Sequence, residues 1–322
     1  MSINISVVIP TYNRPALLCN CLIALINQSL VKSAYEVLVV SDGYDAATEE
    51  AVHTLAKQFP YLHYLHLPQK KGPAAARNRG WQEALAPLVA FTDDDTLPDV
   101  HWLSAYCEAY HNEKYIAFTG LVKVPISFPP TDYEKNTAGL ETAEFVTANC
   151  CCTKAALEAV KGFDERFSMA WREDSDLHFK LMMHQIPIKK ISNALVVHPV
   201  RLAPWGISIK EQKKGIFNAL LYKKHPQLYR QRIQSSPIRS YYIIVCCVLL
   251  VAIGIYQNNT KLILLAALGW ALLTIRFITK RLDSTRHSAS HIGEMITTSI
   301  AIPILSVYWQ LYGAVKYRVL FI

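Results

Sequence analysis

The sequence lacks the cysteine spacing of a zinc site or a disulfide framework. It has eight cysteines in 322 residues but no CxxC pair. Three of them, Cys150–Cys152, are adjacent, and Cys246 and Cys247 lie in an apolar run. Zinc sites need ligand pairs at defined spacings, so we expect reduced, buried thiols in a cytosolic domain instead.

The sequence also lacks the basic stripe with interleaved aromatic residues that is typical of nucleic-acid-binding domains. The net charge is +8 but is unevenly spread. Residues 1–235 contain 25 Lys and Arg against 23 Asp and Glu, whereas residues 236–322 contain 8 against 2. The basic excess belongs to the most apolar quarter of the chain, which indicates a membrane surface and no nucleic acid as partner.

No charged residue occurs from Ser240 to Thr260, a stretch long enough to cross a bilayer. The next apolar run, 262–275, reaches spanning length if the charged ends of its flanking residues extend to the membrane surface. We therefore expect a membrane hairpin near 240–279. The basic residues after it predict that residues 1–235 lie on the cytoplasmic side of the inner membrane. These residues are Arg276, Lys280, Arg281 and Arg286.

Two further segments are expected at the membrane. The uncharged run 295–315 contains Thr297, Ser299 and Gln310, which favours an interfacial or re-entrant helix near 292–315, with a spanning helix as the alternative. Residues 208–232 combine lysines with aromatic residues, which indicates a basic interfacial helix. A solvated cytosolic face is the alternative for that segment.

Short apolar runs alternate with helical patterns in the first hundred residues. The expected strands are 5–9, 36–40, 61–66 and 88–92, and the expected helices are 16–28, 46–58 and 72–85. Such alternation predicts an α/β fold with a mostly parallel sheet and flanking helices. Farther along we expect helices at 100–112, 153–160 and 174–184, strands at 115–124, 144–150 and 194–198, and a loop at 125–140.

Three adjacent carboxylates, Asp93, Asp94 and Asp95, directly follow the apolar strand 88–92. Their mutual repulsion would be relieved by a cation, and ligands of open α/β sheets bind outside the carboxyl ends of the strands. Oxygen ligands suit Mg²⁺ or Mn²⁺ better than zinc. A solvated acidic turn is the alternative.

Other polar residues stand at the ends of expected elements. Asp42 follows the second strand, Glu173 and Asp174 open a helix, and His198 closes an apolar strand. Each has a structural explanation: a turn residue, acids at a helix N-terminus and a hydrogen-bonded core histidine. Their joint order along the chain favours a functional site.

Six segments in this order resemble the family 2 inverting glycosyltransferases with the GT-A fold. They are Val7–Arg14, Ser41–Gly43, Gly72–Gly80, Asp93–Asp95, Gly162–Phe167 and Glu173–Leu177. The resemblance covers roughly residues 4–200. It is specific for transfer from a nucleotide-sugar and uninformative about which sugar.

The resemblance implies a role for each matching residue. Asp95 would hold the metal on the donor diphosphate, Asp93 would meet the metal or the ribose, and His198 would be a third metal ligand. Asp174 would be the catalytic base, with Glu173 beside it. The expected nucleotide-binding residues are Pro10, Thr11, Tyr12, Arg14, Asp42, Arg77, Asp93 and Asp94.

The chemistry explains why these residue types are needed. The leaving diphosphate gains charge in the transition state, which a divalent ion held by carboxylates neutralises. A hydroxyl acceptor needs a carboxylate base within hydrogen-bond reach. A single base with direct in-line attack inverts the anomeric centre. No Gln-x-x-Arg-Trp motif follows Glu173, which indicates single additions and no polymer extrusion.

We therefore expect a GT-A domain over residues 1–235 and a helical membrane region over 236–322. The expected activity transfers sugar from a UDP-sugar to a lipid-linked saccharide or polyprenyl phosphate, in the synthesis of cell-surface glycans. A sugar-phosphate nucleotidyltransferase would need a Gly-rich N-terminal loop, and residues 9–15 contain no Gly. A degenerate domain that serves as a membrane scaffold or binding module is the non-enzymatic alternative.

Overall fold

The computed structural model describes residues 3–321. The chain divides into two compact units. The N-terminal unit contains the chain up to Pro125 together with Ala138–Val200, and the C-terminal unit contains Ile126–Thr137 together with the chain from Arg201 onward. The expected boundary lay at residue 235, whereas residues 201–235 pack with the C-terminal helices.

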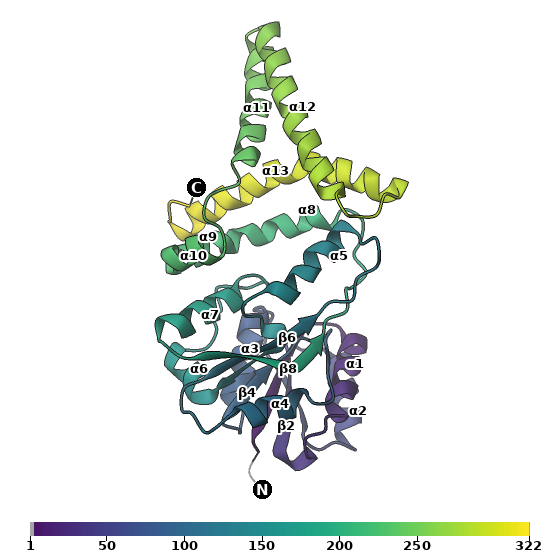
Figure 1. The fold of residues 1–322 in the computed structure, drawn as a ribbon, viewed down its shortest axis with the longest axis vertical. Coiled ribbons are helices and arrows are strands. Elements are labelled where there is room, and N and C mark those ends of the chain that lie inside the picture. Colours follow the sequence, from purple (N-terminus) through teal and green to yellow (C-terminus); the bar gives the residue numbers. More distant parts are fainter. Residues whose placement is uncertain (1–2, 322) are drawn as a thin grey trace. The chain divides into compact units, whose positions relative to one another are not determined.

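An eight-stranded sheet in the order β3-β2-β1-β4-β7-β6-β8-β5 forms the centre of the N-terminal unit (Figure 1). Its first four strands are parallel, as the sequence predicts. All side chains of β1 and β2 are buried, which is typical of strands covered by helices on both faces. The strands are β1 (Ile5–Thr11), β2 (Tyr35–Ser41), β3 (Leu62–His66) and β4 (Leu88–Phe91), and the helices between them are α1 (Pro15–Ile26), α2 (Ala46–Ala56) and α3 (Pro73–Glu83).

The other half of the sheet is mixed. Strand β7 pairs antiparallel with both β4 and β6, while β6 and β8 are parallel. Its strands are β5 (Leu97–Pro98), β6 (Ala117–Lys123), β7 (Cys150–Thr153) and β8 (Ile188–Val197), and its helices are α4 (Trp102–Ala109), α6 (Lys154–Val160) and α7 (Glu173–Met183). Cys150, Cys151 and Cys152 form most of β7 and are buried free thiols, as expected.

The expected strand at 144–150 is wrong in position, because a 3-10 turn (Thr147–Asn149) precedes β7. The buried side chain of Asn149 donates hydrogen bonds to the carbonyls of Leu121 and Ala194, at 2.8 Å each. It also accepts from Trp102 Nε1 at 2.8 Å. A side chain that bonds to neighbouring backbone in this way competes with regular pairing.

The expected loop at 125–140 is also wrong, since it contains α5 (Asp132–Thr137) and a 3-10 turn (Ala138–Thr142). The Glu134 carboxylate accepts hydrogen bonds from the backbone N–H groups of Ser127 and Thr131 at 3.2 and 2.6 Å. The Glu134 side chain thereby satisfies backbone N–H groups just before the first turn of α5, which stabilises the start of the helix.

The C-terminal unit is helical. The expected helix at 208–224 is divided by a 3-10 turn (Gln212–Gly215) into α8 (Ile207–Glu211) and α9 (Ile216–Lys224). Within residues 3–321, three helices are long and apolar enough to cross a membrane. Helices α11 and α12 form a hairpin, and α13 crosses its base beside α8 and α9 (Figure 1). The remaining helices are α10 (Pro226–Arg232), α11 (Arg239–Tyr256), α12 (Thr260–Leu282) and α13 (Ala289–Tyr317).

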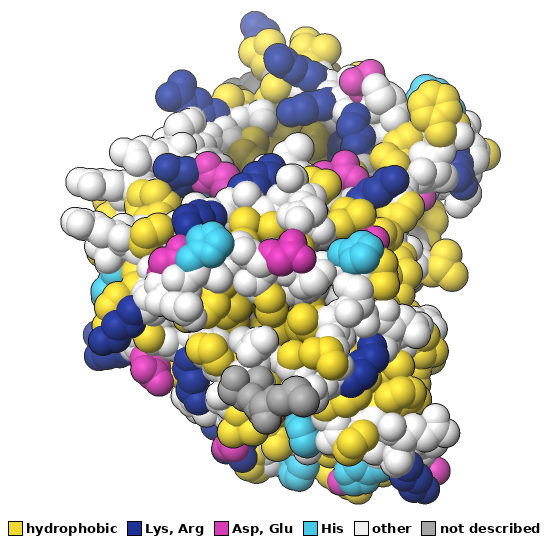
Figure 2. Space-filling model, turned by 60° about the horizontal axis from the view of Figure 1, so that its bottom comes forward, with side chains coloured by type: hydrophobic (Ala, Val, Ile, Leu, Met, Phe, Trp, Pro, Cys, Tyr) yellow, Lys and Arg dark blue, Asp and Glu magenta, His cyan; other side chains and the backbone are white. Residues whose placement is uncertain are grey.

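Figure 2 shows a face on which Lys, Arg, Asp, Glu and His side chains are interspersed among apolar ones. Mixed charges of this kind are typical of a soluble protein surface.

Candidate metal and nucleotide site

The candidate site lies where β1, β2 and β4 end. Thr11, the last residue of β1, is in register with Ser41 of β2, and the Asp42 N–H donates to the Thr11 carbonyl at 2.9 Å. Pro10 is buried within β1. The Asp93–Asp95 triplet follows β4, the neighbour of β1 on its other side. Because β1, β2 and β4 are adjacent and parallel, residues 10–14, Asp42 and residues 93–95 lie at one edge of the sheet, as the sequence predicts.

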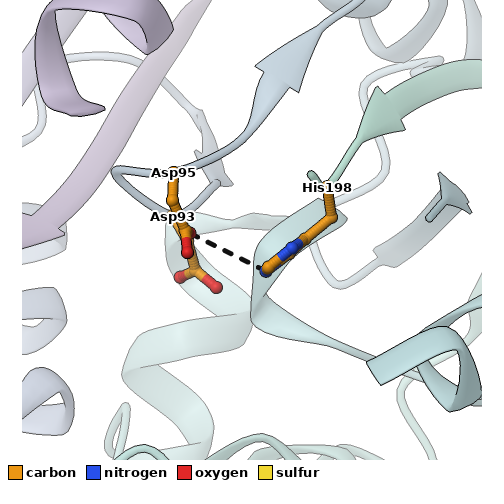
Figure 3. A group of neighbouring side chains, drawn as sticks. All are labelled: Asp93, Asp95 and His198. Carbon is orange, nitrogen blue, oxygen red and sulfur yellow. Dashed lines mark ion pairs between the residues drawn. The ribbon is translucent and has the colours of Figure 1, made fainter. Parts of the chain in front are cut away.

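Asp93, Asp95 and His198 converge in the structure (Figure 3). One ligand atom from each of the three lies within 4.8 Å of the others, which is close enough to share one ion. His198 Nε2 is 3.7 Å from Asp95 Oδ1. The backbone N–H of His198 donates to the Lys123 carbonyl at 2.8 Å, so β6 fixes the position of the histidine.

The donor set of this cluster fits Mg²⁺ or Mn²⁺. The two carboxylates are oxygen ligands that suit Mg²⁺ or Mn²⁺, and the imidazole is a ligand more common for transition metals, which favours Mn²⁺ of the two. His198 Nδ1 is buried and has no hydrogen-bond partner in the described chain. The other ring nitrogen, Nε2, faces Asp95 and is the atom placed to bind an ion.

Asp94, the middle acid, has a different environment. It accepts a hydrogen bond from Thr11 Oγ1 at 2.8 Å and from Arg14 at 3.3 Å. Burial raises the pKa of the Asp94 carboxyl, and the charge of Arg14 opposes the rise. Asp94 therefore ties the loop after β1 to the acidic triplet, and its contact with a nucleotide stays a prediction.

Asp42 holds the loop before α3. Its carboxylate accepts from the Lys71 N–H at 2.6 Å and from the Gly72 N–H, whose distances to the two oxygens are 3.0 and 2.9 Å. Gly72 has φ +103°, a conformation that favours glycine. An ionised carboxylate has about four acceptor positions, so Asp42 keeps capacity for a nucleotide N–H or hydroxyl.

The sequence did not single out Lys70, which the structure places at the same edge. Lys70 Nζ lies 3.5 Å from the centroid of the Tyr12 ring, and Tyr12 is partly exposed. The ammonium is within cation–π distance of the ring. The pair Lys70-Lys71 directly before Gly72 was the available signal, because basic residues attract phosphates.

Arg77 joins Asp93 of the acidic triplet to Glu173, the neighbour of the expected base Asp174. It is buried, and its guanidinium bonds to Asp93 at 2.7 Å and to Glu173 at 3.1 Å. The sequence placed Arg77 in the nucleotide site but gave no sign of this double contact. The residue bridges two carboxylates that are 80 positions apart in the sequence.

Glu173 and Asp174 occupy the first turn of α7 and have different environments. Glu173 is buried, and burial raises its pKa to about 7, although Arg77 opposes the rise. Asp174 is less buried, and its Oδ1 accepts from the Ser175 N–H at 2.6 Å. Burial also raises the pKa of Asp174. A carboxylate with a raised pKa is the stronger base, which suits proton abstraction near neutral pH.

The fold and this arrangement of acids define a glycosyltransferase domain of the GT-A type. Residues 6–162, just under half of the chain, match the model of glycosyl transferase family 2. The three candidate membrane helices follow the domain in the sequence.

The matches to curated relatives cover different parts of the chain. Glycosyltransferase AglE of Haloferax volcanii is 36% identical over 99 residues, which is 31% of this chain and 33% of AglE. Validoxylamine A glucosyltransferase of Streptomyces hygroscopicus subsp. limoneus is 25% identical over 269 residues, which is 70% of this chain and 57% of that protein. The chain thus spans between a third and three fifths of the length of these relatives.

Among solved structures, the mannosyltransferase PcManGT from Pyrobaculum calidifontis, in complex with GDP-Man and Mn²⁺, is similar over almost the whole chain. The TM-score is 0.60 at 18% identity, and the match covers 97% of this chain and 88% of PcManGT. At this identity the likeness establishes the fold.

Proposed function

We propose that this protein is a metal-dependent inverting glycosyltransferase that moves a sugar from a nucleotide-sugar to a membrane-associated acceptor. The observation that carries the proposal is the convergence of Asp93, Asp95 and His198 within 4.8 Å at the carboxyl edge of the sheet. Arg77 connects this cluster to the acids of α7. A donor site and a base are thereby joined in one network.

On the donor side, Asp95, Asp93 and His198 would hold Mg²⁺ or Mn²⁺, which neutralises charge on the leaving diphosphate. Tyr12, with Lys70 beside its ring, would contact the nucleobase of the donor. Pro10, Thr11 and Asp42 would line the same pocket. We propose a UDP-sugar as donor; the GDP-Man bound to PcManGT makes a guanosine donor the natural competitor in a screen.

On the acceptor side, Asp174 would accept the proton of the attacking hydroxyl. Glu173 is held by Arg77 and is less exposed, so Asp174 is the better placed of the two. With Asp174 as the base, the acceptor hydroxyl would attack the anomeric carbon directly, which inverts the anomeric centre. A polyprenyl phosphate acceptor would depend less on Asp174, since a phosphate oxygen is already anionic.

The test is release of nucleoside diphosphate from a panel of donors in the presence of Mn²⁺ or Mg²⁺, with membrane extract as acceptor and mass spectrometry of the product. We expect release with a UDP-sugar, suppressed by EDTA. Asp95→Asn should lose the release, whereas the matched surface variant Asp283→Asn should keep it. Nucleotide binding without any transfer would favour the alternative, a degenerate domain that serves as a membrane scaffold.

We further propose that the hairpin α11–α12 crosses the inner membrane with both ends in the cytoplasm, which places transfer at the cytoplasmic face. The four basic residues after residue 275 support this orientation. The native cysteines that are not buried, Cys19, Cys107, Cys246 and Cys247, are first replaced. A cysteine at Asn258 should then label from outside and one at Ser284 from the cytoplasm. Labelling of both from the cytoplasm would contradict a spanning hairpin.

A further inference from the structure

The two faces of α13 are covered unequally. The residues Ile296, Ile300, Ile304, Tyr308 and Tyr312 recur at every fourth position and are exposed. We call this row the outer stripe. The buried residues of the helix lie on its other side: His291, Met295, Thr298, Ser299, Ile302, Pro303, Val307, Gln310 and Gly313. By contrast, α11 and α12 bury few residues, such as Ile244 and Ala266.

The buried face of α13 packs along residues 206–223. The pairs in order along α13 are Glu294 with Gly206, Trp309 with Gly215, Gly313 with Ala219, and Tyr317 with Lys223. Both series ascend, so the two segments run parallel for most of the length of α13. The approach is close: a Cβ at Gly313 would lie 2.9 Å from the Ile216 carbonyl oxygen. The segment 206–223 is therefore fixed to α13, and the two must share one orientation in a membrane.

The segment and its next residue carry five lysines and a single acid, Glu211. The lysines are Lys210, Lys213, Lys214, Lys223 and Lys224. They are spread along the segment, and Lys213 Nζ lies 5.9 Å from the Trp309 ring, near the middle of α13. If α13 crossed the bilayer, it would carry Lys210, Lys213 and Lys214, which lie beside its interior, into the hydrocarbon, where each charge is unfavourable. If α13 lies in the membrane plane, all five can reach anionic headgroups, where each is favourable.

The outer stripe of α13 also fits an orientation of this helix in the membrane plane. In the view of Figure 1 the hairpin lies on one side of α13, and α8 and α9 lie on the other. An amphipathic helix with an apolar row on one face and basic neighbours on the other is typical of a helix at a bilayer surface.

We propose that α13 and residues 206–223 form a platform in the plane of the membrane. The outer stripe lies among the acyl chains, the lysines contact anionic lipid headgroups, and α11 and α12 alone cross the bilayer. The partner of this surface is a bilayer that contains anionic lipid. The proposal concerns membrane placement and does not depend on the donor or acceptor.

Spin labels on the full-length protein in vesicles test the orientation. Cysteines at Ile296 and Tyr312, which lie about 80° to either side of Ile304 around the helix, should report equal depths in the bilayer, with a label at Ile304 somewhat deeper. A spanning α13 would instead separate the first and last by about 24 Å, at 1.5 Å per residue. Labels at Leu264, Leu268 and Leu272 of α12 are the control and should show a steep gradient. A gradient along α13 as steep as that along α12 would overturn the proposal.

The lipid partner is tested with spin-labelled phosphatidylglycerol and phosphatidylcholine around the reconstituted protein. We expect a several-fold preference for phosphatidylglycerol that weakens at high salt, because exposed charges are screened. The triple variant Lys210→Gln/Lys213→Gln/Lys223→Gln should lose most of this preference. The matched variant Lys57→Gln/Lys161→Gln/Lys189→Gln, in the N-terminal unit, should keep it. Equal association of both lipids with the wild-type protein would refute the headgroup contact.

Discussion

The two units of this protein carry opposite charge. The N-terminal unit contains 16 Lys and Arg against 20 Asp and Glu, whereas the C-terminal unit contains 17 against 5. The acids of the first unit include the triplet after β4 and the pair that opens α7, where a cation and an acceptor proton would be handled. The bases of the second unit accompany its apolar helices. Charge in each unit therefore follows the partner proposed for it, a metal diphosphate in one and an anionic bilayer in the other.

Each unit also buries an arginine, with different results. Arg77 is shared by Asp93 and Glu173, and both of these lie in the proposed reaction centre. Arg281 bonds to Asp132 at 2.7 Å and to the hydroxyls of Thr298, Ser299 and Ser208. These hydroxyls compensate the buried charge without a second acid. The contacts of Arg77 hold two carboxylates in the proposed reaction centre. The contacts of Arg281 join α5 to α8, α12 and α13.

The largest effect should follow from removing the base. Asp174→Asn is expected to lower transfer to a hydroxyl acceptor by about 10³-fold with nearly unchanged donor affinity, since loss of general base catalysis costs about 10²–10⁴. Single-turnover kinetics and nucleotide titration measure the two quantities. Collapse of donor affinity would show that Asp174 belongs to the nucleotide site. Retained transfer would assign the base to Glu173 or indicate a phosphate acceptor.

Loss of a metal ligand should follow in size. Asp95→Asn keeps the shape of the side chain but removes its charge, so turnover should fall by about 10²-fold, as for other lost electrostatic contributions to a transition state. Mn²⁺ binding, followed by electron paramagnetic resonance, should weaken in parallel. Turnover equal to wild type that EDTA still suppresses would locate the metal elsewhere.

The arginine of the C-terminal unit should matter for stability and not for chemistry. Asp132→Ala leaves Arg281 buried without its acid, and we expect that unit to lose about 2 kcal/mol, because three hydroxyls remain as partners. Thermal unfolding in detergent measures the loss, and nucleoside diphosphate release from soluble donors should stay unchanged. The exposed pair Arg79–Glu83 supplies the control, since Glu83→Gln should change the unfolding temperature little. Equal shifts in both variants would contradict a special role for Arg281.

The smallest effect concerns pH. The base acts in its ionised form, and burial raises the pKa of Asp174. Activity should therefore fall as the pH decreases through a value above the ordinary aspartate pKa of about 3.9. Glu173→Gln removes a negative charge beside Asp174 and also stops neutralising Arg77. Both changes favour ionised Asp174 and lower its pKa, so the acidic limb of the activity profile should move to lower pH. The pH profile of kcat/KM measures both, and an unmoved limb would show that Asp174 does not determine it. Glu158→Gln, an exposed position, is the control.

Much of the fold could be predicted because periodicity and chain direction are local properties. The strands at β1, β2 and β4 and the polar residues after them follow from apolar runs that end abruptly, and the convergence of Asp93, Asp95 and His198 is confirmed as geometry. The assignments of these residues to base, nucleotide and metal stay predictions. The 3-10 turn before β7 could not be predicted, because it depends on Asn149 bonding to carbonyls 28 and 45 residues away.

The double contact of Arg77 was equally invisible, since nothing local relates position 77 to position 173. Helix α5 was missed because its short polar sequence matches a loop. Its stabilising partners, above all Arg281, lie far along the chain. The sequence also marked residue 235 as the boundary because hydropathy changes there, whereas contacts place residues 201–235 with the C-terminal helices.

The bond between Asp132 and Arg281 has a consequence for how the protein is made. The two residues are 149 positions apart. A ribosome that adds about 5–20 residues per second delivers Arg281 on the order of 10 s after Asp132. During that interval α11 and α12 are still being made. Residues 126–137, which belong to the C-terminal unit, have been made but still lack the residues that they contact there. Segment 126–137 therefore reaches its final contacts only after α12 has been made, and it stays open to proteases and chaperones until then.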